Sequence, residues 1–183
     1  MIWFFTAYSF EKKIFEAYDA YMNLVENEND WVCFCDGDTA FLIADFGHQI
    51  KKYVEKYPDT GLFTSYASRC HYAVQVRKGT DMENPSILYH KYKAEQTREK
   101  LDGQVKEINR KIAGHLMVIQ KKTWTEIRDT VAKNAAGKNI LSVDTKISRA
   151  VLAANKKILL MRGIYIFHYC RLAEGFRYKK HIE

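Results

Sequence analysis

The sequence predicts a single α/β domain over residues 1–183, with a mostly parallel central sheet flanked by helices. The chain is 47% hydrophobic, and a chain of this length buries enough apolar surface for one core. Short apolar runs rich in β-forming residues alternate with stretches whose apolar residues recur every three or four positions. The first such alternation is strand, helix, strand, and a helical crossover of this kind joins parallel strands.

Six apolar runs are predicted to be strands because they are short, rich in β-branched and aromatic residues, and bounded by polar or turn-forming residues. The first (IWFFTAY) opens the chain, and the second (WVCFC) leads directly into an acidic turn. The last two flank Arg162 and Gly163, which we expect to separate them. In chain order the predicted strands are 2–8, 31–35, 62–65, 115–120, 158–161 and 164–167.

Four helices are predicted from apolar residues on one face of a 3.6-residue period. Ser9 stands at the N-cap position expected for the first helix, and Pro58 ends the second. In chain order the predicted helices are 10–25, 45–57, 124–132 and 144–154.

The segment 77–111 is highly charged and nearly lacks an apolar period. Its central part (YHKYKAEQTREKL) is compatible with an exposed helix ended by Gly103, or with a mobile loop. A charged stretch of this kind is most often a solvated face.

The net charge is +7, from 29 basic and 22 acidic residues. This balance favours anionic ligands, but the interleaved acids argue against a continuous nucleic-acid-binding stripe, so we expect no nucleic-acid partner. No apolar run is long enough to span a bilayer, and the N-terminus lacks the charge pattern of a secretory signal. A cytoplasmic location is therefore predicted.

Four cysteines occur, at positions 33, 35, 70 and 170. Cys33 and Cys35 would point to the same face of a strand, which is a strained geometry for a disulfide. The Cys-x2-Cys pairs of a zinc site are absent. Reduced thiols are the prediction.

The most specific local feature is Asp36-Gly37-Asp38, directly after the second predicted strand. Ligands of open α/β sheets bind beyond the carboxyl ends of strands. Two carboxylates separated by one flexible glycine can face the same divalent cation. The structural alternative is an acidic turn.

The run CDGDT resembles the signature of haloacid-dehalogenase-type phosphatases. That resemblance implies Asp36 as nucleophile and Asp38 as general acid/base, with Ser65 as the later hydroxyl. It also implies a second acidic pair at the end of a later strand, and no such pair follows residue 100 in that setting.

Four segments in order resemble a family-2-like GT-A-type glycosyltransferase, whose domain is Rossmann-like. They are DWVCFCDGDTAFL, GHLMVIQKKTWTEI, SVDTKISRAVLAANKKILL and GIYIFHYCRL. The resemblance implies a hexosyltransferase-like enzyme with a DxD motif and a nucleotide-sugar donor. It implies that Asp36, Asp38 and His168 hold a metal ion, and oxygen ligands with one imidazole suit Mn²⁺ or Mg²⁺. The alternatives are a solvated turn for the aspartates and a strand-end histidine for His168.

The same resemblance makes Asp144 the candidate general base for an acceptor hydroxyl, in a reaction that inverts the sugar. Position 143 is Val, where the family usually has the first acid of a Glu-Asp pair. If the reaction retains stereochemistry, Asp144 would orient substrate instead, and as a structural alternative it caps a helix. The residues implied in donor or nucleotide binding are Thr6, Ala7, Tyr8, Asp36, Gly114, His115 and Arg171.

One departure from the family lies before the DxD motif, where only one predicted helix stands between the first and second strands. The resemblance therefore implies an abbreviated domain with a thinner site for the UDP- or GDP-sugar. A catalytically inactive anion-binding module remains the further alternative. The acceptor is expected to be a glycan or glycolipid, with 77–111 on the acceptor side. The basic tail from Glu174 is compatible with peripheral contact at the inner face of a membrane.

Overall fold

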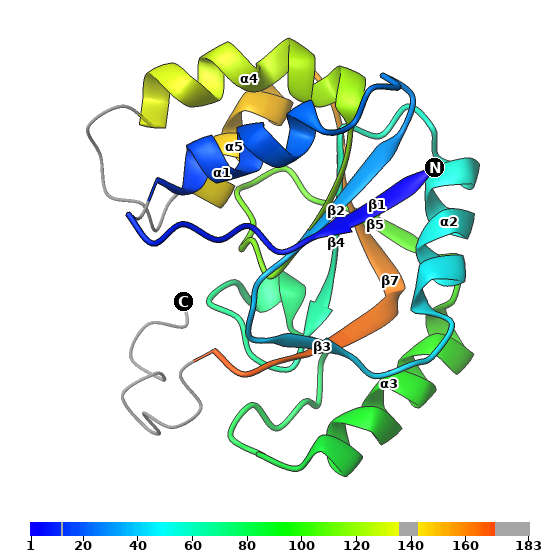
Figure 1. Cartoon of the computed structure of the whole chain (residues 1–183). Coiled ribbons are helices and arrows are strands. Elements are labelled where there is room, and N and C mark those ends of the chain that lie inside the picture. Colours follow the sequence, from blue (N-terminus) through cyan, green and yellow to red (C-terminus); the bar gives the residue numbers. More distant parts are fainter. Residues whose placement is uncertain (12, 136–142, 171–183) are drawn as a thin grey trace. The chain divides into compact units, whose positions relative to one another are not determined.

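The computed structural model describes residues 1–11, 13–135 and 143–170, which form an α/β fold (Figure 1). The sheet order is β1-β2-β6-β4-β7-β3, with β5 beside β7. The strands are β1 (Ile2–Phe5), β2 (Trp31–Cys35), β3 (Thr39–Phe41), β4 (Leu62–Ala67), β5 (Val105–Glu107), β6 (Leu116–Gln120) and β7 (Ile158–His168). The helices are α1 (Ile14–Asn23), α2 (Phe46–Lys56), α3 (Ile87–Leu101), α4 (Lys121–Ala135) and α5 (Val143–Ala153), with a 3₁₀ turn at Ala73–Gln75.

The predicted α/β class, with a sheet flanked by helices, is confirmed, and the sheet is mixed in direction. The pair β1 and β2 is parallel, as the strand–helix–strand pattern predicts. β4 and β7 also run in the same direction. The Leu62 amide donates to the Lys157 carbonyl where the two strands begin, and the Ser68 amide donates to the Ile166 carbonyl where they end. The pairs β2–β6, β4–β6 and β3–β7 are antiparallel.

The chain forms two compact units. The first unit is 1–37, 58–64 and 107–159, and the second unit is 38–57, 65–106 and 160 onward. The strands β4 and β7 contribute residues to both units. The single domain expected over residues 1–183 stays a prediction.

In the first unit, α1, α4 and α5 pack together beside β1 and β2 (Figure 1). Tyr18 of α1 meets Phe34 of β2 edge to face, with ring centroids 4.4 Å apart. The buried Trp124 of α4 donates its indole N–H to Asp19 of α1 at 3.1 Å. These contacts combine apolar burial with one satisfied polar group, so α1 is held in one register against its neighbours.

The first helix begins later than predicted. Ser9 is not its N-cap: the Ser9 hydroxyl accepts a hydrogen bond from the Lys13 amide at 2.8 Å, and the helix starts at Ile14. Phe10 lies outside the helix and is 87% exposed, so it is not part of the buried stripe. The first strand likewise ends at Phe5 rather than at residue 8.

In the second unit, the helical alternative for the charged segment 77–111 is confirmed over Ile87–Leu101. Ser86 caps this helix by accepting from the Tyr89 amide, and Gly103 follows its end with φ of +71°. Arg98 of α3 forms two hydrogen bonds of 2.6 Å with the carboxylate of Asp45 at the start of α2. Among the described helices none is both long and apolar enough to cross a membrane.

β7 is one strand of eleven residues, and the predicted break at Arg162 and Gly163 is wrong. The Arg162 amide donates to the Gln104 carbonyl at 2.9 Å, so this position stays paired. The Gly163 amide donates to the Tyr53 hydroxyl at 2.9 Å. The glycine is required by close packing rather than by a turn. Two three-residue strands, β3 and β5, were not predicted, because so short a run carries no period.

Gly163→Ala should destabilise the protein by about 2 kcal/mol or more, the range of overpacked interiors. A Cβ at Gly163 would lie 2.6 Å from Asp102 Cα and 2.7 Å from Tyr53 Oη. Urea unfolding measures the change. The matched control is Gly47→Ala in α2, where a Cβ meets nothing within 4 Å and helix propensity favours Ala by up to about 1 kcal/mol. Equal stability of the two variants would contradict the packing argument.

Candidate functional site

The short strand β3 places Asp38 beside the end of β7, within the second unit. In the antiparallel β3–β7 ladder Thr39 lies opposite His168. The Asp38 carbonyl accepts from the Tyr169 amide at 2.9 Å, and Asp38 Oδ2 accepts from the Cys170 amide at 3.0 Å. These bonds leave Asp38 Oδ1 3.3 Å from His168 Nε2.

The imidazole of His168 is fixed from its other side. Its Nδ1 lies 2.9 Å from the carbonyl oxygen of Arg69, so Nδ1 carries the proton and donates it. The Ser68 hydroxyl accepts from the His168 amide at 2.9 Å and donates to the His168 carbonyl at 3.1 Å. A ring N–H bonded to a backbone carbonyl is the usual arrangement of a metal-ligating histidine, because it directs the other nitrogen's lone pair to the metal.

The contact between Asp38 Oδ1 and His168 Nε2 is favourable only when a positive charge lies between the two atoms, because both are hydrogen-bond acceptors. With Nδ1 as the donor, a neutral imidazole presents the Nε2 lone pair to the Asp38 carboxylate, and two facing lone pairs repel each other. A proton on Nε2 or a cation between the groups removes this repulsion. Side-chain exposure is 8% for His168 and 44% for Asp38, so the contact is reached from the Asp38 side.

Asp36 precedes Asp38 by two residues, so its proximity to Asp38 follows from the local backbone. Asp36, Asp38 and His168 each offer a ligand atom within 4.8 Å of the others. Two carboxylates and one imidazole are a donor set that fits Mn²⁺ or Mg²⁺. The three residues expected to bind a metal therefore fit one.

The pKa of Asp38 is lowered from its ordinary value. The main cause is a hydrogen bond from His168, which forms when Nε2 also carries a proton and the ring is positively charged; the Cys170 amide acts in the same direction, while partial burial opposes the change. A lowered pKa keeps the carboxylate ionised at neutral pH, which is the form that binds a cation.

Asp36 and Asp144 line one pocket, of about 290 Å³, in the first unit. Asp36 continues the β2–β6 pairing by one step, because its amide donates to the His115 carbonyl at 3.3 Å. Asp144 stands in the first turn of α5, and its Oδ2 accepts from the Gly114 amide at 3.0 Å. We call this the carboxylate pocket, and its lining residues are Ala7, Ile14, Tyr18, Asp36, Gly114, Val143 and Asp144.

Asp144 has a pKa raised to about 6. Burial is the largest cause, and the nearby negative charge of Asp36 acts in the same direction. Amide donors from Thr145, at 2.6 Å, and from Gly114 oppose the rise but do not cancel it. A carboxyl group of this pKa can exchange a proton near neutral pH.

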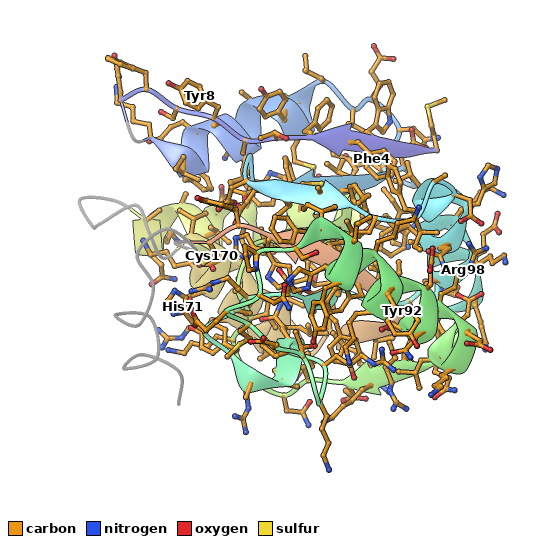
Figure 2. All side chains as sticks on the ribbon, turned by 90° about the horizontal axis from the view of Figure 1, so that it is seen from below. Phe4, Tyr8, His71, Tyr92, Arg98 and Cys170 are labelled. Carbon is orange, nitrogen blue, oxygen red and sulfur yellow. The ribbon has the colours of Figure 1, made fainter. Side chains whose placement is uncertain are left out.

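The other predicted donor-binding residues are distributed unevenly. Ala7 and Gly114 line the carboxylate pocket, and a Cβ at Gly114 would lie 3.0 Å from Asp144 Cβ. His115 is fully buried, and its backbone carbonyl is what contacts Asp36. Thr6 is exposed, and Tyr8 is 72% exposed on the segment after β1 (Figure 2). Arg171 and the basic tail from Glu174 lie outside the described residues.

Sequence reasoning missed three residues that shape these sites. Ser68 and Arg69 follow β4 and hold His168, and the rule that placed Asp36 at a strand end could have found them. Tyr18 lines the carboxylate pocket, and its pKa is raised by burial and then by the charges of Asp36 and Asp144. Tyr18 lies within the predicted helix 10–25, and an aromatic residue on the apolar face of a helix carries no sign of a functional role.

A larger hollow, of about 670 Å³, lies in the second unit between α3 and the segment before α2. None of the predicted site residues lines it. Its lining residues are Leu42, Ile43, Ala44, Lys91, Glu95, Arg98, Glu99 and Asp102. Because its charged groups are of both signs and exposed, its volume alone does not make it the functional site.

Comparisons of the chain with protein-family models, curated protein sequences and solved structures give no match. The described geometry and the residues of the sequence are therefore what bears on function.

The raised pKa of Asp144 predicts a pH dependence of stability. The folded protein holds the Asp144 proton up to about pH 6, whereas the unfolded chain loses it near pH 4, so stability falls as pH rises through this window. Asp144→Asn removes this loss, worth up to about 3 kcal/mol. Its stability relative to wild type should therefore rise between pH 4 and pH 7 in urea unfolding.

The control for this experiment is Asp59→Asn, which changes an exposed aspartate of the same unit. Its stability relative to wild type should be nearly constant over the same pH range. A flat difference for Asp144→Asn as well would mean that the carboxyl group is not held in its acid form by burial.

Proposed function

We propose that the protein is a metal-dependent glycosyltransferase that moves a sugar from a nucleotide-sugar donor to a glycan or glycolipid acceptor. The observation that carries the proposal is the Asp38–His168 contact, with Nε2 and Oδ1 3.3 Å apart and the imidazole oriented by a backbone carbonyl. Asp36 supplies the second carboxylate. These are the residues that the resemblance to GT-A-type enzymes selects.

The proposed cofactor is Mn²⁺ or Mg²⁺, held by Asp36, Asp38 and His168. When bound, such an ion neutralises the charge that develops on a diphosphate leaving group. The Cys170 amide donates to Asp38 Oδ2 and favours the anionic form of this ligand, and the Arg69 carbonyl keeps the His168 ring in the ligating tautomer.

Asp144 is the proposed general base for the acceptor hydroxyl. A base with a pKa of about 6 is largely ionised at neutral pH and still takes a proton readily. The Gly114 and Thr145 amides fix both oxygens of the carboxyl group, so its orientation is set before a substrate arrives. This role implies inversion at the sugar, and a retaining reaction would leave Asp144 to orient the substrate.

The carboxylate pocket supports binding of the donor sugar rather than of the whole nucleotide. Its volume of about 290 Å³ is at the lower limit of ligand pockets. This is consistent with the thinner donor site expected from an abbreviated domain. The UDP or GDP part is proposed to extend along the exposed segment that carries Thr6 and Tyr8.

The phosphatase alternative is less well supported by the described residues. It needs Asp38 as a proton donor, yet the pKa of Asp38 is lowered rather than raised. It also needs an accessible hydroxyl at Ser65, which is fully buried. An inactive anion-binding module would have no need for a buried carboxyl group with a raised pKa such as that of Asp144.

The segment 77–111 remains the proposed acceptor side. Its helix α3 exposes Leu88, and it also exposes Tyr92, which Figure 2 labels. The net charge of +7 is compatible with a cytoplasmic enzyme that touches the inner face of a membrane when its acceptor is lipid-linked.

The proposal predicts that UDP or GDP binds only with Mn²⁺ and only when Asp38 is intact. Isothermal titration calorimetry of a nucleoside-diphosphate panel, with and without Mn²⁺, measures this on wild type and Asp38→Ala. We expect binding to wild type with Mn²⁺, and an affinity at least about tenfold lower in Asp38→Ala, since one of the metal's protein ligands is removed.

Asp59→Ala is the matched control, because it removes an exposed aspartate outside the site. It should bind as wild type does. Nucleotide binding that ignores both Mn²⁺ and Asp38 would contradict the proposal. Absence of binding, together with turnover of a generic phosphomonoester and a fluoroberyllate adduct on Asp36, would favour the phosphatase.

A further inference from the structure

Arg69 is a buried cation at the end of β4, with only 1% of its side chain exposed. A guanidinium in such a place loses its hydration, and its ion pairs do not by themselves make burial favourable. Its partners are nevertheless well defined. Nη1 donates to the Met82 carbonyl at 2.7 Å and approaches Glu83 Oε2 at 3.3 Å, while Nε donates to the Cys170 carbonyl at 3.2 Å.

These contacts connect Arg69 to both metal ligands of the second unit. The Arg69 carbonyl accepts the Nδ1 proton of His168 at 2.9 Å. The Arg69 side chain holds the Cys170 carbonyl, and the Cys170 amide donates to Asp38 Oδ2 at 3.0 Å. Arg69 therefore orients the His168 ring through its backbone carbonyl, and it holds the Asp38 carboxylate through its side chain and Cys170.

The hydrogen bonds of Cys170 are formed in a particular backbone conformation. Its φ is +25°, a value uncommon outside glycine. In this conformation the amide of Cys170 is directed to Asp38 and its carbonyl to Arg69. The Arg69 guanidinium and the Asp38 carboxylate each form a hydrogen bond with Cys170 in this conformation, so losing the guanidinium removes one of the two bonds that favour it.

We propose that Arg69 is a positioning residue for the metal site: by holding Cys170 and the segment Met82–Glu83, it sets the separation of Asp38 Oδ1 and His168 Nε2 at the value that a divalent cation requires. This inference rests on the proposed metal-dependent function. The interaction of Arg69 with Glu83 also ties the site to the segment that precedes α3.

The test compares Mn²⁺ affinity in wild type, Arg69→Lys and Arg98→Lys, measured by electron paramagnetic resonance of free Mn²⁺. Lysine keeps the charge of Arg69 but cannot bridge two partners in a planar fork. Arg98→Lys is the matched control, because it removes a bidentate pair with Asp45 in the same unit without touching His168. We expect Arg69→Lys to bind Mn²⁺ about tenfold or more weakly, the usual effect of losing an outer-shell partner, and Arg98→Lys to bind as wild type.

A second readout follows the His168 ring itself. Nitrogen-15 NMR of the metal-free protein, with the His168 signals assigned by their loss in His168→Gln, should show a single Nδ1–H tautomer in wild type and Arg98→Lys. Arg69→Lys keeps the backbone carbonyl that accepts the Nδ1 proton, so the tautomer should be unchanged, but the Nε2 signal should shift because the Asp38 carboxylate is no longer held beside it through Cys170. A change of global stability alone would not shift the Nε2 signal of the folded protein.

The outcomes separate this inference from the proposed function. Unchanged Mn²⁺ affinity and an unchanged Nε2 signal in folded Arg69→Lys would overturn the positioning role and leave the metal site standing. If wild type itself binds no Mn²⁺, the proposed function and this inference both fail. If Arg69→Lys does not fold, Glu83→Gln decides. It weakens the same connection at a side chain that is 27% exposed, and a loss of Mn²⁺ affinity of about threefold or more supports the role, whereas wild-type affinity overturns it.

Discussion

The pairing of β3 with β7 is the interaction on which the candidate site depends. It covers only three residues of β3, yet it brings the Asp38 carboxylate to the Cys170 amide, 132 residues away in the sequence. The closing entropy of so long a loop grows only slowly with its length and is offset by the folding of the whole unit. The proposed metal ligands Asp38 and His168, far apart in the sequence, can therefore meet without a large cost to metal affinity.

The surroundings of two aspartates, Asp38 in the second unit and Asp144 in the first, shift their pKa values in opposite directions. Hydrogen bonds to His168 and Cys170 lower the pKa of Asp38, whereas burial and the charge of Asp36 raise that of Asp144. Carboxyl groups with separated pKa values can take different chemical roles at one pH. Under the proposed function, Asp38 remains an anionic ligand while Asp144 exchanges a proton.

The sequence predicted much of the fold and named Asp36, Asp38 and His168 as candidate ligands, but it did not predict the contacts that hold them. Buried strands such as Trp31–Cys35 and Leu116–Gln120 were predictable because each is a continuous apolar run between polar residues. β3 was not, since Thr39–Phe41 is too short to carry a pattern. Gly163 was misread as a break, because its close contact with Tyr53 and Asp102 is long-range and leaves no local signal.

The same limit explains why Arg69 was not a candidate while His168 was. His168 was predicted because the segment that carries it resembles the last of the four segments of a GT-A-type glycosyltransferase, whereas an arginine after a strand is normally solvated. What distinguishes Arg69 is burial combined with carbonyl partners on Met82 and Cys170, and both properties arise only from tertiary structure. Ligand residues carry a chemical signature in sequence, but the residues that orient them do not, because any residue with a suitable donor and the right position could serve. The geometry of a site is therefore decided by contacts that only a structure reveals.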